Sequence, residues 1–135
     1  MFFLDTNVII AVMNRRDDAI DVRLQNEIVA GSTLIVPVPV LFELRYGAAK
    51  SQNSARNHER IDAFLTAISE IMEFDDADAC VAGGIRAFLE SKGTPIGPYD
   101  LLIAAQARRR EAVLVTLNRR EFERVPGLMV TDWRT

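Results

Sequence analysis

Short apolar runs alternate with longer amphipathic segments along the whole chain, and this alternation limits the folds that the sequence can adopt. A run of three or four apolar residues predicts a buried strand, whereas apolar residues three and four positions apart predict a helix. The repeated strand-then-helix order predicts an α/β fold with one central parallel sheet, right-handed crossovers and helices on both faces. The expected strands cover residues 2–4, 34–36, 71–74, 113–116 and 128–130.

The expected helices lie between these strands, and residues with known end preferences mark their limits. Pro37 and Pro39 are expected to bracket the turn before the third helix. Residues 50–59 are polar and weakly periodic, so we expect a mobile connection there, with His58 at the surface. The expected helices cover residues 8–13, 19–30, 40–46, 61–68, 77–91 and 101–107.

The composition indicates one soluble globular domain covering residues 1–135. Hydrophobic residues make up 49% of the chain and charged residues 26%, and no apolar run approaches the ~18 residues that a membrane span needs. The N-terminus lacks the basic stretch and cleavage site of a signal peptide, so we expect a cytoplasmic protein. The single Cys80 cannot form an internal disulfide and is expected to be a small core residue.

Four acidic residues, Asp5, Glu43, Asp100 and Glu121, recur at a strand's end or just inside the following helix. Ligands of parallel α/β sheets bind beyond the carboxyl ends of the strands, so these acids are expected to face one site. A structural explanation stays open for two of them. Asp5 can cap the first helix, and the helix dipole favours Asp100 by ~0.3–1 kcal/mol.

Carboxylates gathered at one sheet edge repel one another, which raises some of their pKa values unless a cation binds. Oxygen ligands select a hard ion such as Mg²⁺ or Mn²⁺. The chain has one histidine and one cysteine, which excludes an ordinary zinc site and a catalytic pair of histidines. The composition and the acids together therefore point to chemistry that depends on a divalent metal ion.

Five stretches around these acids carry a resemblance to a known family: L-D-T-N at 4–7, F-E-L-R-Y-G-A at 42–48, I-G-P-Y-D-L-L-I-A-A-Q-A at 96–107, L-V-T-L-N-R-R-E-F-E-R-V-P-G-L at 114–128, and D-W at 132–133. The chain resembles PIN-domain ribonucleases, and more closely the VapC-type toxins of bacterial toxin–antitoxin pairs, over essentially its whole length. The resemblance implies a PIN domain, Mg²⁺- or Mn²⁺-dependent cleavage of tRNA or rRNA, and a homodimer. It also implies a VapB-type antitoxin that covers the site. The toxin is then expected to reach DNA only indirectly, through this antitoxin.

Carried over by position, the resemblance makes Asp5 and Asp100 metal ligands and Glu43 a ligand or a water-orienting group. Asn118 and Glu121 depart from the aspartates of many relatives, so Glu121 is expected to take part in catalysis and a second metal ion to bind weakly. Two further sets are expected around the acids. The side chains that orient ligands and waters are Thr6, Asn7, Thr116 and Asn118. The arginines that either hold the RNA backbone or are solvated are Arg15, Arg16, Arg119 and Arg120.

Two alternatives remain open on the sequence. A haloacid-dehalogenase-like phosphatase also begins with an aspartate after its first strand, but it needs a second aspartate where this chain has Asn7. A PIN-like module without activity would only bind RNA or protein. Gly83 and Gly84 lie inside a predicted helix, which predicts close approach of another backbone, either a neighbouring helix or a second subunit.

Overall fold

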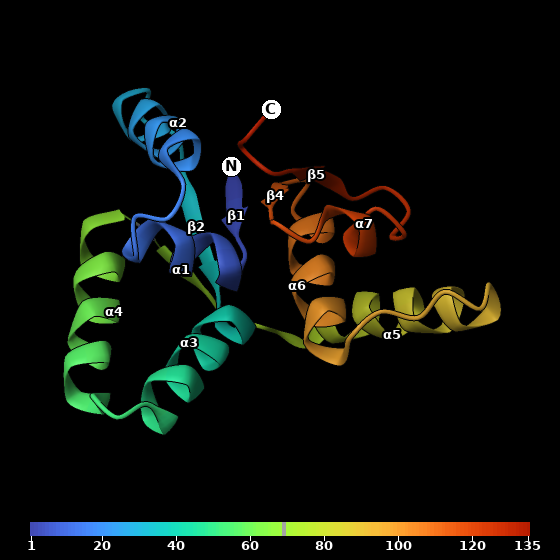
Figure 1. Ribbon diagram of the computed structural model, residues 1–135. Helices are drawn as coiled ribbons and strands as arrows, with labels where there is room; N and C mark the ends of the chain where they lie inside the picture. Colours follow the sequence, from blue (N-terminus) through green and yellow to red (C-terminus); the bar gives the residue numbers. More distant parts are fainter. Residues whose placement is uncertain (69) are drawn as a thin grey trace.

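Five parallel strands form one sheet in the order β3-β2-β1-β4-β5, so the N-terminal strand lies at its centre (Figure 1). The computed structural model describes residues 1–68 and 70–135. The strands are short and agree with the expected positions to within one or two residues. They are β1 (Phe2–Leu4), β2 (Leu34–Pro37), β3 (Glu70–Met72), β4 (Val113–Val115) and β5 (Met129–Thr131).

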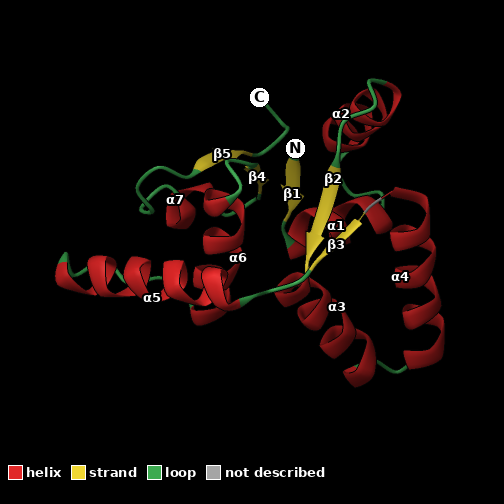
Figure 2. Cartoon of the chain, turned by 180° about the vertical axis from the view of Figure 1, so that it is seen from behind, coloured by secondary structure: helices red, strands yellow, loops and turns green. Residues whose placement is uncertain are grey.

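Seven helices connect the strands within these ranges. They are α1 (Thr6–Met13), α2 (Asp18–Val29), α3 (Val38–Lys50), α4 (Ser54–Ile68), α5 (Asp76–Ser91), α6 (Pro98–Arg109) and α7 (Arg119–Phe122). Figures 1 and 2 show α1 to α4 on one side of the sheet and α5 to α7 on the other, as right-handed crossovers require for this strand order. In the part of the chain that the structure describes, no helix is both long and apolar enough to cross a membrane.

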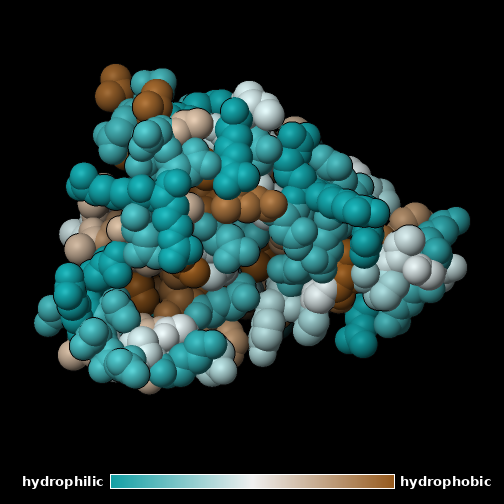
Figure 3. Space-filling model, viewed as in Figure 1, coloured by the Kyte–Doolittle hydropathy of each residue, from teal (hydrophilic) through white to brown (hydrophobic). Residues whose placement is uncertain are grey.

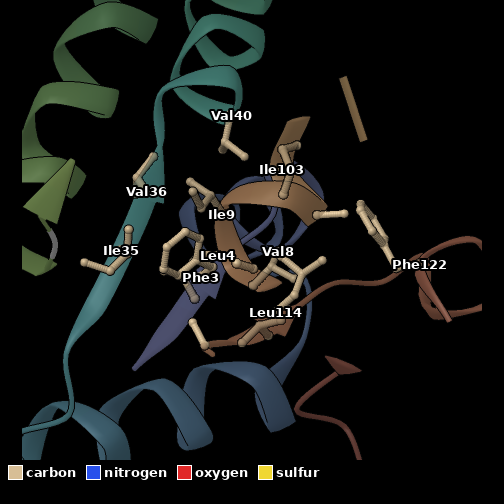
Figure 4. Close-up of a cluster of buried hydrophobic side chains, with 14 of the residues drawn as sticks. Phe3, Leu4, Val8, Ile9, Ile35, Val36, Val40, Ile103, Leu114 and Phe122 are labelled. Atoms are coloured by element: carbon tan, nitrogen blue, oxygen red, sulfur yellow. The ribbon is translucent and has the colours of Figure 1, made fainter. Parts of the chain in front are cut away.

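The core lies between the two helical layers and the central strands. Phe3 and Leu4 of β1 are almost fully buried, and they pack with side chains from both helical layers, including Ile9 of α1 and Ile103 of α6 (Figure 4). Burial of each such side chain contributes roughly 1.5–3 kcal/mol. The register of β1 with β4 pairs Leu4 with Val115, which fixes the position of the residues that follow both strands.

The structure corrects two expectations about helix boundaries. Pro39 lies in the first turn of α3, where a missing N–H leaves no hydrogen bond unmade, and Pro37 ends β2. Most of the expected mobile connection over residues 50–59 is helical, because α4 begins at Ser54. His58 is therefore a helical residue. It is partly buried, and its Nδ1 lies 3.1 Å from a guanidinium nitrogen of Arg45 on α3.

The structure also corrects expectations about α5. The buried residues of this helix are Asp78, Ala82, Ile85 and Leu89, which define one face. Cys80 lies away from that face and is exposed rather than in the core. Gly83 and Gly84 are exposed too, and a β-carbon at either position would meet nothing within 4 Å. No neighbouring helix of the described chain therefore approaches them closely, and the approach of a second subunit stays a prediction.

Candidate functional site

Asp5 follows the central strand and its carboxylate is held from two sides. Oδ1 accepts a 2.8 Å hydrogen bond from the backbone N–H of Thr6, so Asp5 does cap α1. Oδ2 accepts a 2.7 Å hydrogen bond from the hydroxyl of Thr116, which follows the adjacent strand β4. Asp5 is 5% exposed and Thr116 is fully buried. The cap and the candidate ligand are therefore the same residue, and its orientation is fixed.

Glu43 reaches this edge of the sheet from α3. Its Oε1 accepts a 2.8 Å hydrogen bond from the hydroxyl of Thr6. Thr6 thus donates its backbone N–H to Asp5 and its side-chain hydroxyl to Glu43. The α3 helix begins directly after β2, which neighbours β1, so sheet pairing brings Glu43 to the first residues after β1. This placement explains a half-buried carboxylate on a helix face that also carries the buried Leu44.

Asp100 and Glu121 form the other half of the cluster. Asp100 lies in the first turn of α6 and shares a hydrogen bond with the side chain of Glu121 on α7. The other contacts of Glu121 hold it in place: Oε1 accepts from the backbone N–H of Gly97 at 2.7 Å, and Oε2 accepts from the side-chain amide of Asn118 at 2.6 Å. The amide at position 118 therefore positions Glu121.

Gly97 is a site residue that the sequence analysis did not identify. A β-carbon at this position would lie 3.5 Å from Oδ2 of Asp100 and 3.7 Å from Oε1 of Glu121. The glycine therefore lets the backbone lie directly against the two carboxylates and donate to one of them. The signal in the sequence was the Gly-Pro pair just before the helix that carries Asp100.

Burial and mutual repulsion change the acidity of these groups. Burial, followed by the charges of Glu121 and Asp5, raises the pKa of Asp100 to about 7. Burial also raises the pKa of Asp5, despite the hydrogen bond from Thr116, and the pKa of Glu43. The backbone N–H of Gly97 is the main cause that lowers the pKa of Glu121. Within the pair, the proton therefore resides on Asp100.

The donor set fits a hard divalent cation in chemistry and charge. All four acidic side chains offer oxygen, and after burial the charges of Glu121, Asp5 and Glu43 contribute to the raised pKa of Asp100. Within residues 1–68 and 70–135, no three acidic, histidine or cysteine side chains are arranged so that they could hold a metal ion as they lie. Several carboxylate oxygens instead accept hydrogen bonds from neighbouring groups, so metal binding would require these side chains to move.

The remaining predicted residues lie at different distances from this cluster. Thr6, Thr116 and Asn118 hydrogen-bond to its carboxylates. Asn7 is exposed, and in the described ranges its side chain makes no hydrogen bond to the acids. The four arginines also differ among themselves: Arg119 forms salt bridges with Glu123 and Asp132, whereas the exposed ones are Arg15, Arg16 and Arg120.

The sequence and the fold were compared with those of known proteins. Residues 2–128 match the PIN domain family. The chain is 40% identical over 132 residues to the tRNA(fMet)-specific endonuclease VapC of Salmonella typhimurium, covering 98% of this chain and 97% of the relative. It is 36% identical over 133 residues to ribonuclease VapC2 of Rickettsia felis, covering 98% of both.

Two solved structures have the same fold. VapBC2 from Rickettsia felis, bound to a DNA fragment from its promoter, matches with a TM-score of 0.89 and 35% identity over 96% of each chain. DNA-bound VapBC from Salmonella typhimurium also has a TM-score of 0.89, with 39% identity over 98% of this chain and 97% of the other. These matches do not favour the haloacid-dehalogenase alternative. The chain belongs to the PIN-domain family, within its group of VapC ribonucleases.

Proposed function

We propose that this protein is a metal-dependent endoribonuclease that acts as the toxin of a toxin–antitoxin pair. The observation that carries the proposal is the convergence of four carboxylates at one edge of the sheet, where burial together with the charges of the other three raises the pKa of Asp100 to about 7. They come from four separate parts of the chain: the end of β1, α3, α6 and α7. Nothing in the packing of the core requires such repulsion, so a bound cation is the physical reason for it.

In this mechanism Asp5 and Asp100 hold Mg²⁺ or Mn²⁺, and Glu43 either joins them or orients the attacking water. A bound ion would supply positive charge to the phosphodiester oxygens and would lower the pKa of a water for in-line attack. Thr116 and Thr6 fix the orientation of the Asp5 and Glu43 carboxylates through the hydrogen bonds described above. With its pKa raised to about 7, Asp100 is partly protonated near neutral pH, and it would have to be ionised to hold a cation.

The proposed substrate is a structured RNA, and tRNA is the first candidate. The Salmonella typhimurium and Shigella flexneri relatives, 40% and 42% identical to this chain, carry the name tRNA(fMet)-specific endonuclease. Arg15, Arg16, Arg119 and Arg120 are proposed to contact the RNA backbone, each adding a salt-sensitive contribution to affinity. Incubation with purified tRNA and with rRNA, followed by mapping of the ends, separates the two substrate classes.

The proposed partner is a VapB-type antitoxin, because the solved structures of Rickettsia felis and Salmonella typhimurium are VapBC complexes. Both complexes contain DNA, and we propose that this chain reaches DNA only through its antitoxin. The proposed place of action is the cytoplasm, where RNA and antitoxin are available. Co-expression with the small reading frame next to the gene should relieve growth arrest if that frame encodes the antitoxin.

A homodimer is also proposed, and exposed apolar side chains on α3 and α6 support it. Phe42 is 50% exposed, Tyr46 57% and Tyr99 46%, and the rings of Phe42 and Tyr99 lie in contact at a tilt of 40°, with their centroids 5.4 Å apart. Such a contiguous patch of large apolar side chains is typical of a protein interface. Sedimentation at micromolar concentration should give the mass of two chains, and a monomer would contradict the dimer.

The central test compares Asp5→Asn and Asp100→Asn with Asp76→Asn, which changes an exposed aspartate in the first turn of α5. The two site variants should fold and lose both RNA cleavage and growth arrest, because each removes a charged ligand. The control variant should keep wild-type activity. Undiminished growth arrest in the Asp100→Asn strain would overturn the assignment.

A further inference from the structure

A pocket with a mixed polar and apolar lining opens beside Glu43, between α1, α3 and α4. Its volume is about 230 Å³. Figure 3 shows apolar surface inside a hollow over the same three helices, with hydrophilic side chains around it. The apolar walls include Ile10, Met13, Leu44 and Ile61, and the polar groups are Asn14, Glu43, Asn57 and Arg60.

The pocket and the carboxylate site share Glu43. One oxygen of this side chain accepts a hydrogen bond from Thr6, which also binds Asp5, while the same residue lines the pocket. A group seated in the pocket therefore lies directly next to the place where a phosphodiester would be cleaved. For a polymeric substrate, that group is part of the nucleotide adjoining the cleaved bond.

The polar side chains of the pocket are held in place. Nη2 of Arg60 donates to the backbone oxygen of Met13 and to Oδ1 of Asn14, both at 2.9 Å, which joins α4 to the end of α1. The side-chain amide of Asn57 donates to the hydroxyl of Ser51 at 2.9 Å. In the described chain the Oδ1 of Asn57 accepts no hydrogen bond, so it is available to a ligand. Amide and guanidinium groups are the side chains that pair with base edges.

We propose that this pocket binds the unstacked base of the RNA nucleotide adjoining the cleaved bond, and so contributes to the choice of cleavage site. The proposal rests on the ribonuclease function proposed above. The volume lies below the ~300–1,000 Å³ of pockets for drug-sized ligands, which fits a single ring system. Extruded bases are recognised by apolar walls that pack on their faces and polar groups that meet their edges, which is the combination found here.

Gly47 offers a direct way to fill the pocket. It lies within α3 and lines the pocket, and a β-carbon there would meet nothing within 4 Å. A β-carbon therefore has room at this position, and we expect the rest of a leucine side chain to project into the pocket; leucine also favours the helix more than glycine does. Gly84 provides the matched control, because it is an exposed glycine inside α5 with equally open surroundings and does not line this pocket.

The test uses a synthetic RNA that carries the mapped cleavage site, made with the base present or absent at each of the two nucleotides flanking the cleaved bond. Wild-type protein should lose about tenfold or more in kcat/KM when one of these bases is missing. Gly47→Leu should show a similar loss on the intact RNA and no further loss on the abasic RNA. Gly84→Leu should behave as wild type. Wild-type kinetics for Gly47→Leu on the intact RNA would overturn the proposal.

A second measurement does not depend on catalysis or on the folding of the leucine variant. Nucleoside 5′-monophosphates are titrated into the Asp5→Asn protein, and NMR signals of the Asn57 side-chain amide and the Ala48 backbone amide are followed. Saturable shifts are expected for at least one nucleotide, and no shift with any of the four would contradict the base site. If Gly47→Leu cleaves RNA normally but is no longer inhibited by the antitoxin, the pocket binds a segment of the antitoxin and the proposal is wrong. If wild type cleaves no RNA with metal present, the ribonuclease function fails, while the titration still decides the pocket.

Discussion

The hydroxyl of Thr116 donates a 2.7 Å hydrogen bond to Oδ2 of Asp5, joining two residues that are 111 positions apart in the sequence. Parallel pairing of β1 with β4 brings them together, because each residue directly follows its strand. The bond is buried, so it holds the carboxylate in one orientation and keeps it satisfied. This contact links the topology of the sheet to the geometry of the candidate site.

Replacement of Thr116 by valine should therefore affect both stability and activity. Valine keeps the branched shape but leaves a buried carboxylate oxygen without its donor, which costs about 1–3 kcal/mol. Cleavage should fall by roughly 10–100-fold, because the orientation of a proposed metal ligand is lost. Thr116→Ser retains the hydroxyl and should stay close to wild type in thermal melts and in cleavage assays. A loss for Thr116→Ser with wild-type behaviour for Thr116→Val would show that the methyl group, and not the hydrogen bond, is what matters.

Asp100→Asn should stabilise the metal-free protein, and the effect should depend on pH. The pKa of Asp100 is raised from 3.8 to about 7 in the fold. Its ionised form is therefore disfavoured in the native state, so wild-type stability falls as pH rises between these values. The stability advantage of the variant should be absent below pH 3.8 and complete above about pH 7. Melts in EDTA at several pH values test this, and a variant that is less stable at pH 8 would contradict it.

Gly97→Ala should keep the fold while weakening metal binding. The added methyl would lie 3.5 Å from Oδ2 of Asp100 and 3.7 Å from Oε1 of Glu121, which is an ordinary contact distance. The added methyl group would, however, cover part of the surface at which an ion could contact these carboxylates. Melting temperature should change little, whereas the Mn²⁺ concentration for half-maximal cleavage should rise. Unchanged Mn²⁺ dependence would place the ion on another side of the cluster.

Asp78 is a buried acid with a structural role, and it provides a contrast with the site. It accepts hydrogen bonds from Arg109 and Arg110 of the α6 end, and it completes the capping box of α5 with Asp75. Hydrogen bonds from Arg110, Asp75 and Arg109 outweigh the opposing effect of burial and hold its pKa far below the ordinary 3.8. Asp78→Asn should cost about 2–3 kcal/mol at pH 7.

The pH dependence of this effect has the opposite direction to that of Asp100. A lowered native pKa means that the stabilisation by Asp78 is complete above pH 3.8 and is lost as pH falls towards the native value. The difference in stability between wild type and Asp78→Asn should therefore be constant near neutral pH and shrink below pH 3.8. RNA cleavage per folded molecule should not change. A difference in stability between the two proteins that grows below pH 3.8 would contradict this account of Asp78.

The elements of the fold could be predicted from the sequence because each strand is a local apolar run and most helices carry a local periodicity. Residues 54–59 were an exception, because none of the side chains in this polar first half of α4 is fully buried, whereas those of Ile61 and Phe64 further along the helix are. The position of Cys80 was missed for a related reason. Its helix buries the face that includes Asp78 and Ala82, and a buried aspartate gives no hydrophobic signal.

The candidate site could be predicted only in part. Asp5, Glu43 and Asp100 are recognisable because acids at strand and helix ends are local features of the sequence. The contacts between them are not local: Thr116 reaches Asp5 through strand pairing, and Gly97 meets Glu121 across 24 positions. Strand order and the packing of α7 decide these contacts, and neither can be read from a single stretch of residues.

The chemistry of the ends of the cut RNA tests the central claim most directly. If the carboxylates act with a divalent ion and water is the nucleophile, the products carry a 5′-phosphate and a 3′-hydroxyl. Cleavage should then stop in EDTA, return with Mg²⁺ or Mn²⁺, and persist in the His58→Ala variant, which removes the only histidine of the chain. A reaction that uses the ribose 2′-hydroxyl would instead leave a 2′,3′-cyclic phosphate and need a general acid and base. Cyclic-phosphate ends, or full activity in EDTA, would contradict the assignment of Asp5, Glu43 and Asp100 as a catalytic metal site.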